Sequence, residues 1–180
     1  MGLFKNIKKA VEKNTGKSEK ITFDVLPQNE EEVRGLLKDG GTSEFFVAAL
    51  SVTALCKYES DPEEAIRMLN VLRGPQPMTD YEVSWVRERL DGKEYKARSF
   101  FEGATPANNY QVREPFSIIV SSNPYSYDSE GLAILYLKSG GTDYERPVKL
   151  RKKVSSGEWF LWEIQYLADI RVPIAEDPWV

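Results

Sequence analysis

The sequence predicts an α+β protein in which N-terminal helices pack on one face of a mostly antiparallel C-terminal β-sheet of four to five strands. Three observations lead to this prediction. Helix caps and glycine stops punctuate residues 29–92, the hydrophobic period changes from helical to alternating after Gly92, and residues 147–167 form two strand-like runs around a tight turn. Because the helices precede most of the strands, separate layers are favoured over an alternating α/β arrangement.

The first twenty residues differ in charge from the rest of the chain. They contain six Lys and two Glu, whereas the remaining residues contain 18 basic and 26 acidic side chains. Residues 3–13 predict a short basic amphipathic helix, and residues 14–20 predict a linker. We therefore divide the chain into a basic N-terminal segment with its linker, residues 1–20, and a single α+β domain, residues 21–180. The basic helix suits a weak membrane-surface contact; a mobile tail or a helix docked on its own domain is the alternative.

The first predicted strand covers residues 21–26, which alternate in polarity and end at Pro27. Three or four helices follow, and each begins after a residue that caps helix N-termini. They are predicted at 30–39 after Asn29, from Thr42 or Ser43 to about Tyr58, at 62–73 after Asp61, and at 80–91 after Thr79. Because residues 45–55 are apolar on nearly every side, the second of these helices is expected at the centre of the fold.

The C-terminal half predicts strands at 116–120 and 132–137, joined by a loop longer than the usual hairpin connection. A final pair of strands surrounds the turn at residues 155–157. In the first strand of this pair the apolar side chains alternate with basic ones, which predicts one buried and one solvated face; the apolar ones are Val148, Leu150 and Val154. Because residues 159–166 are apolar on both faces, we expect both faces to be covered, with Trp159 and Trp162 in the core.

Composition excludes several classes of protein. The sequence has no histidine, which removes His-dependent nucleophilic triads and His-ligated metals, and it has no glycine-rich phosphate loop. We therefore expect no metal and no cofactor. The acidic body disfavours nucleic acid binding.

The longest apolar run is too short to span a bilayer, the N-terminus lacks a signal peptide's apolar region, and the single Cys56 suits a reducing compartment, so we expect a cytoplasmic protein.

Several short segments resemble those of an uncharacterised bacterial domain-of-unknown-function family. The likeness spans about residues 21–179 and rests on segments 74–77, 101–110, 123–127, 146–153, 159–162, 167–171 and 177–179. The resemblance implies a bacterial, single-domain, cytoplasmic protein, and this family has no assigned activity.

The best candidate site consists of polar and aromatic side chains in two long loops. Tyr and Asn side chains together make a hydrogen-bonding surface suited to peptides or carbohydrates, and the candidates are Asn108, Asn109, Tyr110, Tyr125, Tyr127 and Asp128. We expect the three tyrosines to converge on one partly exposed, concave site, although mutual bracing of the loops is the alternative. Glu163 lies inside an apolar run and must face solvent, a base or a pocket, with Arg171 as its expected partner.

For function, the leading hypothesis is a non-enzymatic module that binds a protein, peptide or carbohydrate ligand. The first alternative is a glycosidase-like hydrolase that uses a carboxylate pair, drawn from Glu102, Asp128, Glu163, Asp169 and Asp177. The second is a membrane-surface accessory protein that uses the N-terminal basic helix. The basic residues at 149–153 form either an anion-binding strip or a solubilising strand edge.

Overall fold

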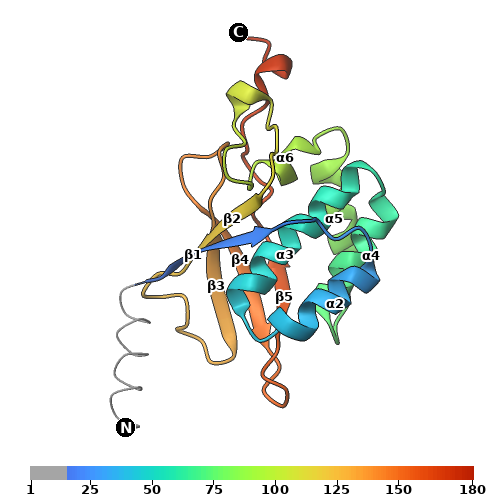
Figure 1. The fold of residues 1–180 in the computed structure, drawn as a ribbon, viewed down its shortest axis with the longest axis vertical. Coiled ribbons are helices and arrows are strands. Elements are labelled where there is room, and N and C mark those ends of the chain that lie inside the picture. Colours follow the sequence, from blue (N-terminus) through green and yellow to red (C-terminus); the bar gives the residue numbers. More distant parts are fainter. Residues whose placement is uncertain (1–15) are drawn as a thin grey trace.

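The computed structural model describes residues 16–180, so the amphipathic helix expected at residues 3–13 lies outside the described residues. Five strands form one antiparallel sheet in the order β1-β2-β3-β4-β5 (Figure 1). Their bounds are Ser18–Phe23 (β1), Phe116–Ser121 (β2), Leu132–Leu137 (β3), Arg146–Lys152 (β4) and Trp159–Ile164 (β5). The helices lie between β1 and β2 in the chain and cover one face of the sheet, which confirms the α+β prediction.

The longer helices begin at the predicted caps. They are α2 (Glu30–Gly40), α3 (Glu44–Cys56), α4 (Pro62–Arg73) and α5 (Asp80–Leu90); shorter turns are η1 (Lys57–Glu59), α6 (Tyr95–Arg98), η2 (Pro106–Asn108) and η3 (Ile174–Glu176). The side chains of Asn29, Ser43, Asp61 and Thr79 each accept a hydrogen bond from a main-chain N–H in the first turn. Since these N–H groups have no partner within the helix, a local side-chain oxygen sets each start. Among the described residues no helix is long and apolar enough to cross a membrane.

Helix α3 is the centre of the fold, as its composition predicts. Ten of its residues are buried, and it packs against all five strands. Helix α4 contacts α2, α3 and β5, so it forms a second layer over the last strand. The buried apolar side chains of these elements form one core cluster. Removing this surface from water, at roughly 25 cal/mol per Å², is the main stabilising contribution to the fold.

Strand β1 begins three residues earlier than the predicted 21–26. Ser18 pairs with Ser121 and Phe23 with Phe116, and Phe23 is buried against the core. Residues 18–20 therefore belong to the sheet, so the predicted linker at 14–20 is wrong over these three residues. The sequence could not place this start because pairing with β2, about a hundred residues away, decides it.

Strand β5 is not covered on both faces, as its composition had suggested. Trp159 and Leu161 are buried, whereas Phe160 and Trp162 are half-buried at the edge of the sheet. Lys149 pairs with Glu163 and Leu150 with Leu161, so Trp162 is the extra residue of a β-bulge. The prediction of a core role holds for Trp159 but not for Trp162. Likewise, Val154, expected on a buried face, lies beyond the end of β4 and is exposed.

Candidate binding site

The two polar-aromatic loops predicted to form one site do not meet. One precedes β2 at residues 102–115 and the other follows it at 122–131. A six-residue strand spans about 20 Å, so loops that flank the same strand lie at opposite ends of it. The prediction that Tyr110 converges with Tyr125 and Tyr127 is therefore wrong, and the two loops form separate surfaces.

In the first loop the candidate side chains stabilise the loop itself. Tyr110 is fully buried, stacks on Tyr95 with ring centroids 5.5 Å apart, and donates a 2.6 Å hydrogen bond to the main-chain oxygen of Arg171. Burial raises the pKa of Tyr110 to about 12. The Asn108 side chain bonds the main chain of Thr105 and Gly103, and the Asn109 oxygen accepts from the N–H of Ala175. Together the three side chains make four hydrogen bonds to the main chain, so these groups are already used within the fold.

In the second loop the aromatic side chains are divided between core and solvent. The Tyr127 hydroxyl donates a 2.6 Å hydrogen bond to Glu44 at the start of α3, and burial together with this bond raises its pKa. Tyr125 is 72% exposed and Asp128 is exposed. The alternative considered above, that these side chains brace their loops, describes Tyr110 and Tyr127.

Glu163 has a partner, but it is not Arg171. Its carboxylate pairs with Lys149 Nζ at 3.0 Å across β4 and β5, and it accepts a 2.9 Å hydrogen bond from Gln165. Arg171 pairs with Asp143 instead at 2.5 Å. The predicted Glu163–Arg171 pair is therefore wrong. Glu163 does line a pocket, which was one of the environments expected for an acid in this run.

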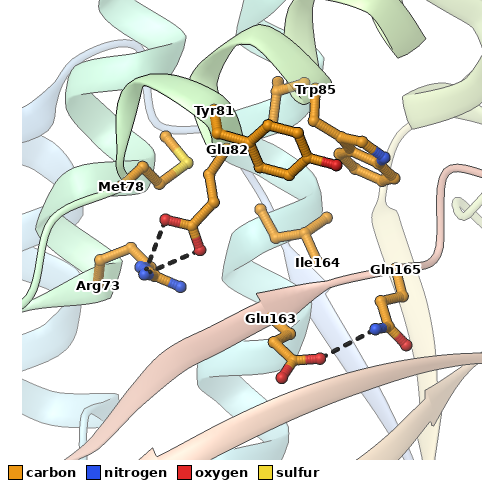
Figure 2. Close-up of a pocket in the computed structure, with 9 residues that line it drawn as sticks. Arg73, Met78, Tyr81, Glu82, Trp85, Glu163, Ile164 and Gln165 are labelled. Carbon is orange, nitrogen blue, oxygen red and sulfur yellow. Dashed lines mark hydrogen bonds and ion pairs between the residues drawn. The ribbon is translucent and has the colours of Figure 1, made fainter.

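A pocket of about 270 Å³ lies between α5, the segment before it and the end of β5. We call it the α5 pocket. Figure 2 shows its lining side chains, which are Arg73, Met78, Tyr81, Glu82, Trp85, Val86, Glu163, Ile164 and Gln165.

Aromatic side chains on α5 form the wall of the α5 pocket. Tyr81 and Trp85 are one helical turn apart, so they project from the same face of the helix (Figure 2). Tyr81 is 78% exposed, and the guanidinium carbon of Arg89 lies 5.3 Å from the Trp85 ring centroid. Ile164 projects toward these rings from β5. The wall therefore presents the exposed ring of Tyr81 beside the half-buried ring of Trp85, which also packs against the core.

The polar end of the pocket is held by a hydrogen-bond network around Arg73. This side chain is only 5% exposed; it donates to the main-chain oxygen of Gln76 at 3.1 Å and pairs with Glu82 at 3.1 Å. Glu82 also accepts from the main-chain N–H of Thr79 in the capping box of α5. Since each group has several partners, the charged end of the pocket is ordered before any ligand arrives.

A second hollow, of about 340 Å³, lies against the other side of Arg73, and we call it the basic groove. Its lining residues are Arg73, Pro75, Gln76, Arg151, Lys152, Lys153, Phe160 and Trp162. The two hollows thus follow the edge strand β5, with Arg73 between them.

The carboxylates of the α5 pocket are not arranged as a catalytic pair. Glu82 faces Arg73, whereas Glu163 projects to the opposite side of β5 from Ile164 (Figure 2). Each is already bonded to a basic side chain. Among residues 16–180 no cluster of three or more Asp, Glu or Cys side chains has the geometry to hold a metal ion.

Sequence reasoning identified Tyr81 and Trp85 only as apolar positions of a helix. One signal was present in the sequence: Tyr81 and Trp85 stand at i and i+4, so they form an aromatic pair on one face of a short helix. How far these two rings are exposed, however, depends on how α5 lies relative to β5. The local sequence pattern carries no information about that arrangement.

The comparisons with known proteins support a family assignment. Residues 25–174 match the family described as Domain of unknown function (DUF6935). Neither the curated proteins nor the solved structures gave a match. The match covers most of the chain and confirms the resemblance noted in the sequence. This chain therefore belongs to the DUF6935 family of domains of unknown function.

Proposed function

We propose that this chain is a non-enzymatic binding module and that the α5 pocket receives an apolar or aromatic side chain of a protein partner. The observation that supports this proposal is the aromatic pair Tyr81 and Trp85, which stands beside an apolar floor while Tyr81 remains 78% exposed. A partner side chain placed between α5 and Ile164 would remove this apolar surface from water, and the hydrophobic effect would drive the association.

The chemistry of the pocket favours a protein partner. Tyr, Trp, Met and Arg are the residue types enriched at the centres of protein interfaces, and all four line this pocket. The network of Arg73 and Glu82 keeps the polar end ordered, so little conformational entropy is lost on binding. The exposed Gln165 amide supplies a hydrogen-bonding group at the rim.

A hydrolase that uses a carboxylate pair is less well supported. Glu82 and Glu163 point to opposite sides of β5 and each is paired with a base, so neither is placed to act with the other on one substrate. The membrane-surface alternative depends on residues 3–13, which lie outside the described residues. A reducing compartment such as the bacterial cytoplasm suits a module whose single cysteine is unpaired.

The proposal is tested by selecting peptides from a displayed library against the immobilised full chain and measuring their affinities by fluorescence anisotropy. We expect selected peptides to contain an aromatic or aliphatic anchor and to bind Tyr81→Ala and Trp85→Ala about thirtyfold more weakly, the loss typical of a central interface residue. Tyr144→Ala is the matched control, because Tyr144 is an equally exposed tyrosine (82%) that does not line the pocket.

Melting temperatures of all three variants serve as the check on folding. Peptides that bind Tyr81→Ala and Trp85→Ala as tightly as the unmodified chain would place the binding surface elsewhere and overturn the proposal. A selection that yields no peptide above background would do the same.

A further inference from the structure

The basic groove carries positive charge that the described residues do not neutralise. Apart from Arg73, its cations are Arg151, Lys152 and Lys153, and none of these three takes part in an ion pair of residues 16–180. No carboxylate is among the lining residues that the structure describes. All three side chains are exposed, so the groove presents unneutralised positive charge to solvent, which attracts anions.

The groove is positively charged on a protein whose net charge is negative. Residues 16–180 contain 20 basic and 27 acidic side chains, so their net charge is negative. A concave site with apolar walls concentrates its own field, and here the half-buried rings of Phe160 and Trp162 supply those walls. A small anion gains from this local potential, whereas a long polyanion such as nucleic acid also meets the repulsion of the acidic body.

Aromatic rings lie beside two of the cations. The guanidinium carbon of Arg151 lies 4.7 Å from the Trp162 ring centroid, and Lys152 Nζ lies 5.6 Å from the Trp159 centroid. Stacking leaves the N–H groups in the guanidinium plane available, and Arg151 donates no side-chain hydrogen bond within residues 16–180. Because the stacked side chain is already ordered, less entropy is lost when it binds a ligand.

From this arrangement we propose that the basic groove binds the phosphate groups of a small polyphosphate. A guanidinium fork matches two oxygens of one phosphate, while the ammonium groups of Lys152 and Lys153 supply point charges for the next. The positive charge around this hollow of about 340 Å³ is more than a single carboxylate can neutralise. A polyphosphate carries several negative charges within a short length, so it matches the groove better. The half-buried ring of Phe160 offers an apolar surface to an organic group attached to the phosphates.

The test is isothermal titration calorimetry of the full chain with inorganic pyrophosphate, ADP and citrate at about 0.15 M salt, where weak surface attraction is screened. We expect saturable binding of pyrophosphate and ADP at one site, and at least about tenfold weaker binding of citrate, a carboxylate anion of similar charge. Arg151→Ala should weaken the phosphate ligands about tenfold, the loss of a charged hydrogen bond. Arg151→Lys keeps the charge but loses the fork, so we expect an intermediate loss.

Lys138→Ala is the matched control, because Lys138 is an exposed cation that does not line the groove.

Tighter binding of ADP than of pyrophosphate would identify an organic phosphate as the ligand, and equal binding would identify the inorganic oxyanion; both support the site. Equal binding of citrate and pyrophosphate, an equal loss in Lys138→Ala, or no saturable binding would overturn it. If Arg151→Ala does not fold, Lys153→Ala and Arg151→Lys provide the same comparison. Because Tyr81 and Trp85 do not line this groove, failure here leaves the proposed function of the α5 pocket intact.

Discussion

Arg73 and Trp162 contact each other in two ways. The Arg73 Nη1 donates a hydrogen bond to the main-chain oxygen of Trp162, and its guanidinium carbon lies 5.7 Å from the centroid of the Trp162 ring. Trp162 is the bulged residue of β5, so Arg73 bonds a carbonyl at the irregular point of the edge strand. The last residue of α4 thereby fixes the strand between the two hollows.

Replacing Arg73 should therefore destabilise the fold. Arg73→Met leaves the Trp162 carbonyl and Glu82 without their buried partner, and we expect a loss of about 2–4 kcal/mol in the free energy of unfolding, measured by urea denaturation. Arg34→Met removes an arginine from an exposed helix pair and should cost less than about 0.5 kcal/mol. Equal costs for the two variants would show that Arg73 acts only as a surface charge.

The contact between Gly74 and Phe160 gives a second prediction. Gly74 has φ +62°, and a Cβ atom there would lie 2.2 Å from Cδ1 of Phe160. We expect Gly74→Ala to cost about 2 kcal/mol or more, from backbone strain and from displacement of the ring. Gly35→Ala is the control: it lies within α2, a Cβ would meet nothing within 4 Å, and the change should stabilise by about 0.5–1 kcal/mol. Thermal melts of the two variants that shift in the same direction would contradict this reading.

Cys56 should react slowly in the native protein. It packs against the core at the end of α3 with part of its surface exposed, and desolvation raises the pKa of its thiol well above the usual range. Because the thiolate is the reactive species, we expect labelling by a disulfide reagent at about pH 8 to be more than about a hundredfold slower than in denaturant. Native labelling at the denatured rate would mean that the thiol is open to solvent.

Tyr110 should make stability fall at alkaline pH. Burial raises its pKa to about 12 in the folded state, against about 10 in an unfolded chain. The folded state therefore keeps the proton longer, so this contribution to stability is complete below about pH 10 and is lost as the pH rises toward 12. Tyr110→Phe should show a shallower fall in urea-unfolding free energy across this window. Tyr144→Phe provides the exposed control, and identical slopes for the two variants would rule out the proposed linkage.

The sequence by itself determined the helices and most of the strands. Asn29, Asp61 and Thr79 each satisfy main-chain N–H groups within three residues, so the start of each helix is encoded locally. The apolar composition of residues 45–55 likewise determined that α3 would be central, because such a helix has no face to present to water. The alternation of apolar and basic side chains along β4 also follows from neighbouring residues.

Only the tertiary structure decided which side chains are available to bind a ligand. In the sequence, Tyr110 and Tyr127 cannot be distinguished from exposed tyrosines. The hydroxyl of Tyr110 bonds Arg171, 61 residues away, and that of Tyr127 bonds Glu44, 83 residues away. Tyr81 looked like a core position and is exposed. Arg73 meets Trp162 across 89 residues and separates the two hollows. Local patterns encode hydrogen bonds that a residue makes within its own helix or turn, whereas burial and pairing between distant segments depend on how the helices and the sheet pack together.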